Sequence, residues 1–215
     1  MTTLVLSYNC RLTMSAVELR GGGGDNIAIA ISSDSVFEGD RLKIHSSGLG
    51  ELALFPLGSR ITMRITNSVM EDVDVSFTTF DTQPPGTRIE FGFNTFVMRK
   101  PNLSIGCESN SGSAYRSTRF ENNILLSLAP GATDVVTGNN CILTNNVLLP
   151  QTTLALGNFV MDPQFVDVEN NNFRLRAGSP ALGTALTAPI ITSDHDYAGA
   201  SRPQGFGPDI GAYEQ

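Results

Sequence analysis

The sequence contains little charge and few aromatic side chains. Charged residues make up 16% of the 215 residues, aromatic residues make up 7%, and tryptophan is absent. Because charged residues usually account for about a quarter of a globular chain, this surface must carry many uncharged polar groups. The low aromatic content indicates a core built mainly from aliphatic side chains.

Positive charge is especially scarce. Lysine occurs only at Lys43 and Lys100, and the formal net charge is −7. Basic residues do not cluster anywhere, whereas nucleic acids and anionic membranes are recognised by clustered basic patches. No apolar run reaches the roughly 18 residues of a membrane-spanning helix. We therefore expect neither a nucleic-acid partner nor a membrane span.

Cysteine and histidine are also rare. The three cysteines, Cys10, Cys107 and Cys141, are odd in number and widely spaced, so we expect buried free thiols and no disulfide framework. The two histidines, His45 and His195, do not form a ligand pair with metal-site spacing. The sequence therefore predicts no metal site and no cofactor.

One short pattern recurs six times between residues 15 and 147. Each copy has a small polar residue, any residue and then a large apolar one, and successive copies lie 23 to 28 residues apart. The copies are Ser15-Ala16-Val17, Asp40-Arg41-Leu42, Asn67-Ser68-Val69, Asn94-Thr95-Phe96, Asn122-Asn123-Ile124 and Asn145-Asn146-Val147. A period of 20 to 50 residues is typical of repeat architectures.

Short strand-like runs surround each copy and precede it. The preceding runs occupy residues 4–6, 27–31, 52–55, 75–77, 105–107 and 134–136. They are β-branched or aliphatic, and clusters of Gly, Asp, Ser, Asn and Pro separate them. No segment has a helical apolar period. A sandwich or barrel gives no reason for one polar position to recur at this spacing, so we predict an all-β, single-stranded parallel β-helix of about six coils.

Stacked coils explain why the polar member of the pattern recurs. Asparagine tolerates the left-handed conformation at a bend, and stacked amides can hydrogen-bond from coil to coil. We predict such a ladder from Asn67, Asn94, Asn122 and Asn145, with Ser15 and Asp40 as its weaker start. The apolar members of the pattern are predicted to point into the core.

The column one residue beyond the apolar members is predicted to face outward. It consists of Glu18, Lys43, Met70, Val97, Leu125 and Leu148. The column changes from charged to apolar along the stack, and an exposed apolar stripe needs a cover. Residues 151–215 are the expected cover, and a binding or oligomer surface is the alternative.

The character of the sequence changes after Pro150, where the recurring pattern gives way to a series of other motifs. We assign residues 1–150 to the coils and residues 151–215 to a last strand, a cap and a tail of the same domain. Five motifs follow one another: DPQFV at 162–166, FRL at 173–175, GSPA at 178–181, DYAGASRP at 196–203 and DIGAYE at 209–214. This order resembles the carboxy-terminal part of bacterial right-handed parallel β-helix proteins of the pectin-lyase-like superfamily, the choice-of-anchor Q domain type.

The resemblance implies a right-handed β-helix and a secreted or surface-displayed bacterial protein, often with a separate anchor. The chain begins inside a strand without a leader and ends at Gln215 without an anchor. We therefore expect a fragment of a longer chain, and a homo-oligomer is a further possibility.

Charged residues of the tail are expected to fasten it to the coils. We predict a latch in which Arg202 pairs with Asp209, Asp196 contributes, and Ile210 and Tyr213 pack inward. Binding of a metal or a saccharide by these residues is the alternative interpretation.

Relatives with this fold include polysaccharide lyases and glycosidases. A lyase needs a base beside a bound cation, so Ca²⁺ would be its cofactor, and a glycosidase needs two carboxylates at a defined separation. Candidate substrate-binding residues are Arg64, Asp72, Asp74, Asp81, Arg88 and Glu90. Ordinary solvated loop charges are the simpler interpretation of these residues.

The sequence thus leads to three functional hypotheses. The first is an extracellular or cell-surface β-helix module that is a scaffold or contacts glycans without its own catalysis. The second is a truncated carbohydrate-active enzyme that acts on an acidic polysaccharide. The third is a segment of a trimeric spike or adhesin, with the outward apolar stripe as its interface. A polysaccharide is the expected partner in the first two.

Overall fold

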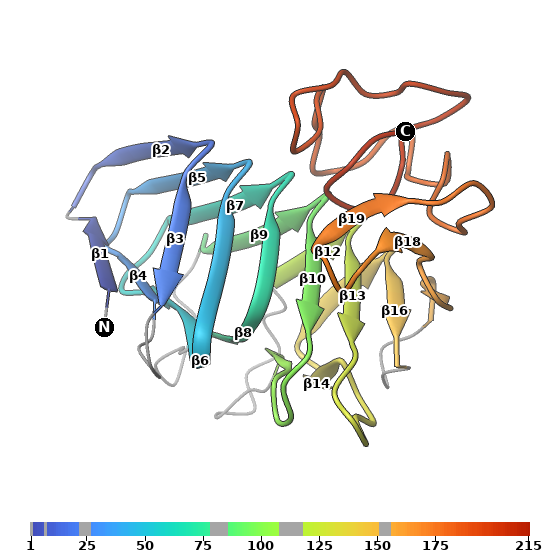
Figure 1. Cartoon of the computed structure of the whole chain (residues 1–215). Coiled ribbons are helices and arrows are strands. Elements are labelled where there is room, and N and C mark those ends of the chain that lie inside the picture. Colours follow the sequence, from blue (N-terminus) through green and yellow to red (C-terminus); the bar gives the residue numbers. More distant parts are fainter. Residues whose placement is uncertain (1, 7, 22–26, 78–85, 108–117, 151–155) are drawn as a thin grey trace.

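The structure, a computed structural model, describes residues 2–6, 8–21, 27–77, 86–107, 118–150 and 156–215. Within these ranges the chain is all-β without a helix and forms a parallel β-solenoid of about four turns (Figure 1). The predicted all-β solenoid is therefore confirmed. The same ranges contain no helix long and apolar enough to span a membrane. The last residues, orange to red in Figure 1, pack against the stack.

One sheet of the solenoid has six parallel strands. They are β2 (Arg11–Ser15), β5 (Val36–Asp40), β7 (Thr62–Thr66), β9 (Arg88–Gly92), β12 (Thr118–Glu121) and β15 (Cys141–Thr144). Each strand pairs in register with the strand of the next repeat, so residues 23 to 29 positions apart lie side by side. The repeat seen in the sequence is therefore the repeat of the coils.

A second sheet has eleven parallel strands. They are β1 (Thr2–Leu6), β3 (Glu18–Gly21), β4 (Ile27–Ile31), β6 (Lys43–Pro56), β8 (Val69–Phe77), β10 (Thr95–Met98), β11 (Ile105–Cys107), β13 (Ile124–Ser127), β14 (Val136–Gly138), β16 (Val147–Leu149) and β17 (Phe159–Val160). The long strand β6 pairs with β3 near its start and with β4 near its end, so it covers two sides of a coil. Outside the stack, β18 (Phe165–Asp167) and β19 (Asn172–Leu175) form an antiparallel pair.

The interior of the solenoid is filled by side chains that alternate along the strands. In β5 Phe37 and Gly39 are buried, and their neighbours are partly exposed. Further along the stack, the rings of Phe91 and Phe120 lie parallel, with centroids 4.6 Å apart. Phe96 meets both rings edge-on. Like residues therefore lie over like residues in this part of the core, as stacking of equivalent positions requires.

The two sheets meet at a corner where one residue of each coil is left-handed. These corner residues are Ala16, Arg41, Asn67, Phe93, Asn122 and Asn145, with φ between 49° and 58°. The ladder is formed by the residues that follow the corner in the later coils, namely Ser68, Asn94, Asn123, Asn146 and Asn158. Each ladder side chain accepts a hydrogen bond from a backbone N–H of the preceding coil, for example Asn94 N to Asn123 Oδ1 at 2.9 Å.

Of the predicted ladder, Asn94 belongs to this buried ladder, whereas other predicted members bond from coil to coil outside it: Asn145 Nδ2 donates to Asn122 Oδ1 at 2.8 Å, and Asn67 Nδ2 donates to Asp40 Oδ1 at 2.8 Å. Asn67, Asn122 and Asn145 lie one position earlier, at the left-handed corner, where Phe93 is their equivalent. The predicted set mixed two registers because Asn122 and Asn145 begin Asn-Asn pairs, and it missed the buried row formed by Asn123 and Asn146. The observed ladder is buried: Asn94, Asn123 and Asn146 are 0% exposed.

The same one-residue shift exchanges members of the two predicted columns. Met70, Leu125 and Leu148 belong to the interior core, whereas Val69, Ile124 and Val147 lie in a second apolar cluster outside it. This second cluster also contains residues of the tail, listed here as Phe165, Phe173, Leu175, Ala181, Ala185, Ile210 and Ala212. Residues from 165 onward therefore cover an apolar stripe, as predicted, but of the predicted column only Val97 lies under the cover.

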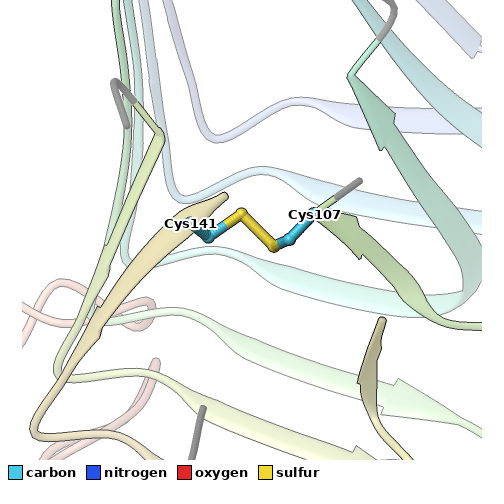
Figure 2. The surroundings of a disulfide bond; sticks show 2 residues. All are labelled: Cys107 and Cys141. Atoms are coloured by element: carbon cyan, nitrogen blue, oxygen red, sulfur yellow. A yellow bond between two sulfur atoms is a disulfide. The ribbon is translucent and has the colours of Figure 1, made fainter. Parts of the chain in front are cut away.

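Two cysteines form a disulfide, so the prediction of three free thiols is wrong. Figure 2 shows Cys107 at the end of β11 joined to Cys141 at the start of β15, with Cα atoms 5.4 Å apart. The two residues are 34 positions apart in the chain. In a solenoid, residues that are widely separated in the chain come together on stacked coils. The wide spacing of the cysteines was therefore no argument against a disulfide. Cys10 is not in a disulfide.

The tail contains a buried charged cluster around Arg202. Its Nη1 lies 2.7 Å from Glu214 Oε2, and it also donates to the backbone oxygen of Asp209. The carboxylate of Asp209 instead accepts from the backbone N–H of Gly183, and Asp196 accepts from the backbone N–H of Glu214. The predicted latch residues thus lie together, but the acidic partner of Arg202 is Glu214 and not Asp209. Ile210 is buried, and Tyr213 is partly exposed.

Candidate functional site

A polar cavity of about 580 Å³ lies between the six-stranded sheet and the tail segment 192–195. We call it the corner groove. Its sheet side consists of Thr13, Ser15, Glu38, Gly39, Asp40, Arg64, Thr66 and Asn67, and its tail side consists of residues 192–195. The groove exists because the tail passes over the corner that follows β5 and β7.

The floor of the groove belongs to a column of alternating charges on the outer face of the sheet. Strand register places Thr13, Glu38, Arg64, Glu90 and Arg119 side by side on successive strands. Arg64 donates to Glu90 Oε2 through Nη2 at 2.6 Å and through Nε at 2.9 Å. Opposite charges on neighbouring strands stabilise this arrangement and hold the side chains in fixed positions.

Asp40 is the most heavily hydrogen-bonded carboxylate of the groove. Its Oδ1 accepts from Asn67 Nδ2 at 2.8 Å and from Thr66 Oγ1 at 3.3 Å. Its Oδ2 accepts from Ser15 Oγ and from Arg41 Nε. Burial raises the pKa of Asp40, but the donated hydrogen bonds from Asn67 and other groups outweigh burial, so the pKa lies below its ordinary value.

His195 connects this carboxylate to the tail. Its Nε2 lies 2.9 Å from Asp40 Oδ2, and its Nδ1 lies 2.6 Å from Asp194 Oδ1. The contact with Asp40 is the largest cause that raises the pKa of His195, burial opposes it, and Asp194 adds to it. Ser193 completes the tail wall: its hydroxyl donates to the backbone oxygen of His195 and accepts from Asn67 Nδ2.

The groove is equipped to exchange hydrogen bonds with a polar ligand. It offers carboxylates, a guanidinium, hydroxyls and an amide, and those of Asp40, Arg64, Asn67 and Ser193 are held by neighbours on adjacent coils or on the tail. Both ring nitrogens of His195 face carboxylates, so the imidazole does not point at the Ser193 hydroxyl as a base would. The geometry therefore favours binding of a ligand over nucleophilic catalysis by Ser193.

The sequence-predicted substrate residues fall into two separate groups. Arg64 and Glu90 are paired in the outer column, and Arg88 is exposed on the same strand as Glu90. Asp72 and Asp74 lie on β8 and accept hydrogen bonds from the backbone N–H groups of Arg99 and Ser104, respectively.

Asp72 and Asp74 thus hold the turns of a neighbouring coil and do not line the corner groove. Asp81 lies outside the described residues. The single acidic groove that the enzyme hypothesis needed is therefore not assembled by the described members of this set. Among the described residues no group of three or more His, Cys, Asp or Glu side chains is arranged to hold a metal ion.

No family model and no curated protein matches this sequence. The assignment of a function to the corner groove therefore depends on its own geometry.

Sequence reasoning missed Glu38, Ser193 and His195 as parts of one site. Asp40 and His195 are 155 positions apart, and no periodicity indicates where an irregular tail crosses a solenoid. A usable signal was present in the tail, because His195 stands between Asp194 and Asp196. A histidine flanked by carboxylates is a candidate for a charged hydrogen-bond bridge.

Proposed function

We propose that this protein is a glycan-contacting β-solenoid module that binds neutral saccharides in the corner groove and has no catalysis of its own. The observation that supports the proposal is the set of charged and polar groups that line the groove, among which Asp40, Arg64 and Asn67 are held by hydrogen bonds between coils. Sugars present many hydroxyls, and each hydroxyl both donates and accepts. A groove with ordered carboxylate, guanidinium and amide groups satisfies such a ligand.

The charge of the groove favours a neutral glycan over an acidic one. Three carboxylates line it, those of Glu38, Asp40 and Asp194, against the cations Arg64 and protonated His195. Arg64 is already paired with Glu90, and the whole chain has a net charge of −7. An acidic polysaccharide would therefore meet repulsion on approach, and among the described residues that line the groove it would find no unpaired cation.

The expected affinity is modest. Among the described residues that line the groove none is aromatic, so binding energy comes from hydrogen bonds rather than ring stacking. A typical hydrogen bond contributes about 0.5–1.5 kcal/mol net. A few such bonds, less the cost of association, correspond to dissociation constants on the order of 1 mM.

We further propose the finer features that the resemblance implied. These are a right-handed solenoid with one coil for each strand of the six-stranded sheet, membership of the pectin-lyase-like superfamily with a choice-of-anchor Q type tail, and a secreted or cell-surface location. The order of the five tail motifs and the in-register parallel strands support this proposal. Diffraction from crystals would decide the handedness and the coil count.

The binding proposal is tested by titrating the protein with neutral oligosaccharides, such as cello-, laminari- and xylo-oligosaccharides, with an oligogalacturonate as the acidic comparison. We expect binding of at least one neutral series and weaker binding of the acidic one. Glu38→Gln and Arg64→Ala should each weaken binding by about fivefold, which corresponds to about 1 kcal/mol. The absence of binding by every neutral series would contradict the proposal.

Arg60→Ala is the matched control. Arg60 is also an arginine paired with a carboxylate of a neighbouring coil, since its Nη2 lies 2.8 Å from Asp34 Oδ2. It does not line the corner groove. We expect Arg60→Ala to leave the affinity unchanged, and an equal loss in both arginine variants would place binding elsewhere.

A further inference from the structure

His195, in the tail, contacts the solenoid through one ring nitrogen and its neighbour Asp194 through the other. Nε2 faces Asp40 Oδ2 at 2.9 Å, and Nδ1 faces Asp194 Oδ1 at 2.6 Å. A neutral imidazole carries one N–H and can donate to one of these carboxylates only, whereas an imidazolium donates to both. The observed bridge is therefore complete only when the ring is protonated.

We propose that His195 is a pH-operated clasp of the corner groove: its imidazolium holds residues 192–195 against β5, and its deprotonation loosens this wall. The consequence for glycan affinity rests on the proposed function. The clasp itself is a property of the ligand-free protein. It concerns the regulation of the groove, so it can be tested without any saccharide.

The charged groups around His195 come from three parts of the molecule. Asp40 contacts it from the end of β5, and Asp194 contacts it from the tail. Arg41, at the corner, donates to the same Oδ2 of Asp40. Arg202 donates from Nε to the backbone oxygen of His195. The ring thus faces two carboxylates directly, while the nearby guanidinium groups contact Asp40 or the backbone.

Two further charged side chains, Glu38 and Arg64, line the same cavity. Arg64 is paired with Glu90, and Glu38 accepts from Arg11 Nη2 at 2.7 Å. Each therefore has a partner of opposite charge on a neighbouring strand. The titration of the ring is then governed mainly by Asp40 and Asp194.

Loss of the ring proton should loosen the wall without unfolding the solenoid. Asp40 keeps its hydrogen bonds from Asn67, Thr66 and Arg41, so its carboxylate stays satisfied. Upstream of the wall, the backbone N–H of Ile191 still donates to Glu121 Oε2. The bond from Asn67 Nδ2 to Ser193 Oγ also remains. What is lost is the positive charge and one of the two ring N–H donors, so the ring can no longer donate to Asp40 and Asp194 together, and charge-assisted bonds are among the stronger classes of hydrogen bond.

The direction of the pH dependence follows from the two pKa shifts. The pKa of His195 is raised above 6.5, so its contribution is fully present below about 6.5 and is lost as the pH rises through the raised value. The pKa of Asp40 is lowered below 3.8, so its contribution is present above about 3.8 and is lost as the pH falls through the lowered value. The clasp is therefore closed between these two limits.

The test is an NMR pH titration of the ligand-free protein that follows the two histidine rings and the backbone amides of residues 192–195. We expect the His195 ring to titrate with a midpoint above that of an ordinary histidine, about 6.5, and the amides of residues 192–195 to shift with the same midpoint. His195→Gln should remove this amide transition, because glutamine does not titrate.

The control is His45→Gln. His45 is the other histidine of the chain and also faces a carboxylate, with Nε2 at 2.9 Å from Glu18 Oε1, but it lies on β6 and does not line the groove. We expect His45→Gln to leave the amide transition of residues 192–195 unchanged. A His195 midpoint at or below 6.5, amides that do not follow the ring, or a transition that persists in His195→Gln would overturn the clasp.

These results separate the clasp from the proposed function. If the ring and the amides titrate together but no saccharide binds, the clasp stands and the glycan proposal fails. If a neutral saccharide binds equally well on both sides of the His195 midpoint, and the amides of residues 192–195 stay constant, the clasp fails alone. If both hold, affinity should fall severalfold as the pH rises through the midpoint.

Discussion

Arg202 Nη1 lies 2.7 Å from Glu214 Oε2, and the two side chains are 1% and 0% exposed. The guanidinium also donates from Nη2 to the backbone oxygen of Gly211 at 2.7 Å and packs 4.7 Å above the ring of Phe93. Because Phe93 is a corner residue of the solenoid, the Arg202 side chain connects the last residues of the tail with one another and with the coils.

Replacement of Arg202 by methionine should therefore destabilise the protein strongly. The change leaves the carboxylate of Glu214 buried without its cation, and breaking a buried pair in this way costs about 3–5 kcal/mol. Chemical denaturation measures the loss. Arg174→Met is the control, since Arg174 is exposed and stacks over Tyr213. Its effect should stay below about 1 kcal/mol, and equal losses in the two variants would contradict the latch.

The disulfide should contribute to stability in oxidising conditions. Cys107 and Cys141 close a loop with a sequence separation of 34 residues, and such cross-links typically contribute about 2–4 kcal/mol. We expect Cys107→Ser to lower the free energy of unfolding by this amount, and a reductant to have the same effect on the wild type. Cys10→Ser should not change the response to reductant. A wild type that melts identically with and without reductant would show that the cross-link is not formed.

The ladder predicts that Asn123 contributes more to the stability of the protein than Asn139 does. Asn123 accepts the backbone N–H of Asn94 and donates to the backbone oxygen of Phe91, and it is 0% exposed. Asn123→Ala leaves these buried backbone groups without partners, and each such group costs about 1–3 kcal/mol of stability. The melting temperature of this variant should therefore fall clearly below that of the wild type. Asn139→Ala, at an exposed position between β14 and β15, should have little effect. The ladder is contradicted if the two melting curves coincide.

A substitution at Gly92 tests how closely the tail packs against the six-stranded sheet. A Cβ added at Gly92 would lie 2.4 Å from Ile191 Cγ2, which is closer than real contacts allow. Gly92→Ala should therefore displace Ile191 and cost about 1–3 kcal/mol. Gly205→Ala is the control, because a Cβ there meets no atom within 4 Å. Unchanged stability in Gly92→Ala, measured by thermal unfolding, would mean that Ile191 does not pack on the end of β9.

The sequence was sufficient to predict an all-β parallel solenoid because the repeat is a direct consequence of stacking. Equivalent positions share an environment, so Ser15, Asp40, Asn67, Asn94, Asn122 and Asn145 recur at similar spacing even though their exact register differs. The apolar stripe under the tail was predictable for a similar reason, since uncovered apolar surface is unfavourable in water. Both inferences use only the period and the polarity of side chains.

Register and tertiary contacts were beyond that reasoning. A shift of one residue moves a side chain to the other face of a strand, and the Asn122-Asn123 pair fits both registers. The pairing of Cys107 with Cys141 depends on which coils stack, which their separation in the chain does not indicate. The corner groove depends on an irregular tail that meets the solenoid through contacts such as Asn67 with Ser193. Such contacts follow from the path of the tail and have no period.

The most direct test of glycan binding in the corner groove is a map of backbone amide shifts during a titration with the best-binding neutral oligosaccharide. We predict that the changes concentrate at Glu38, Asp40, Arg64, Asn67 and residues 192–195. Changes confined to other surfaces, or none at saturating saccharide, would contradict the account.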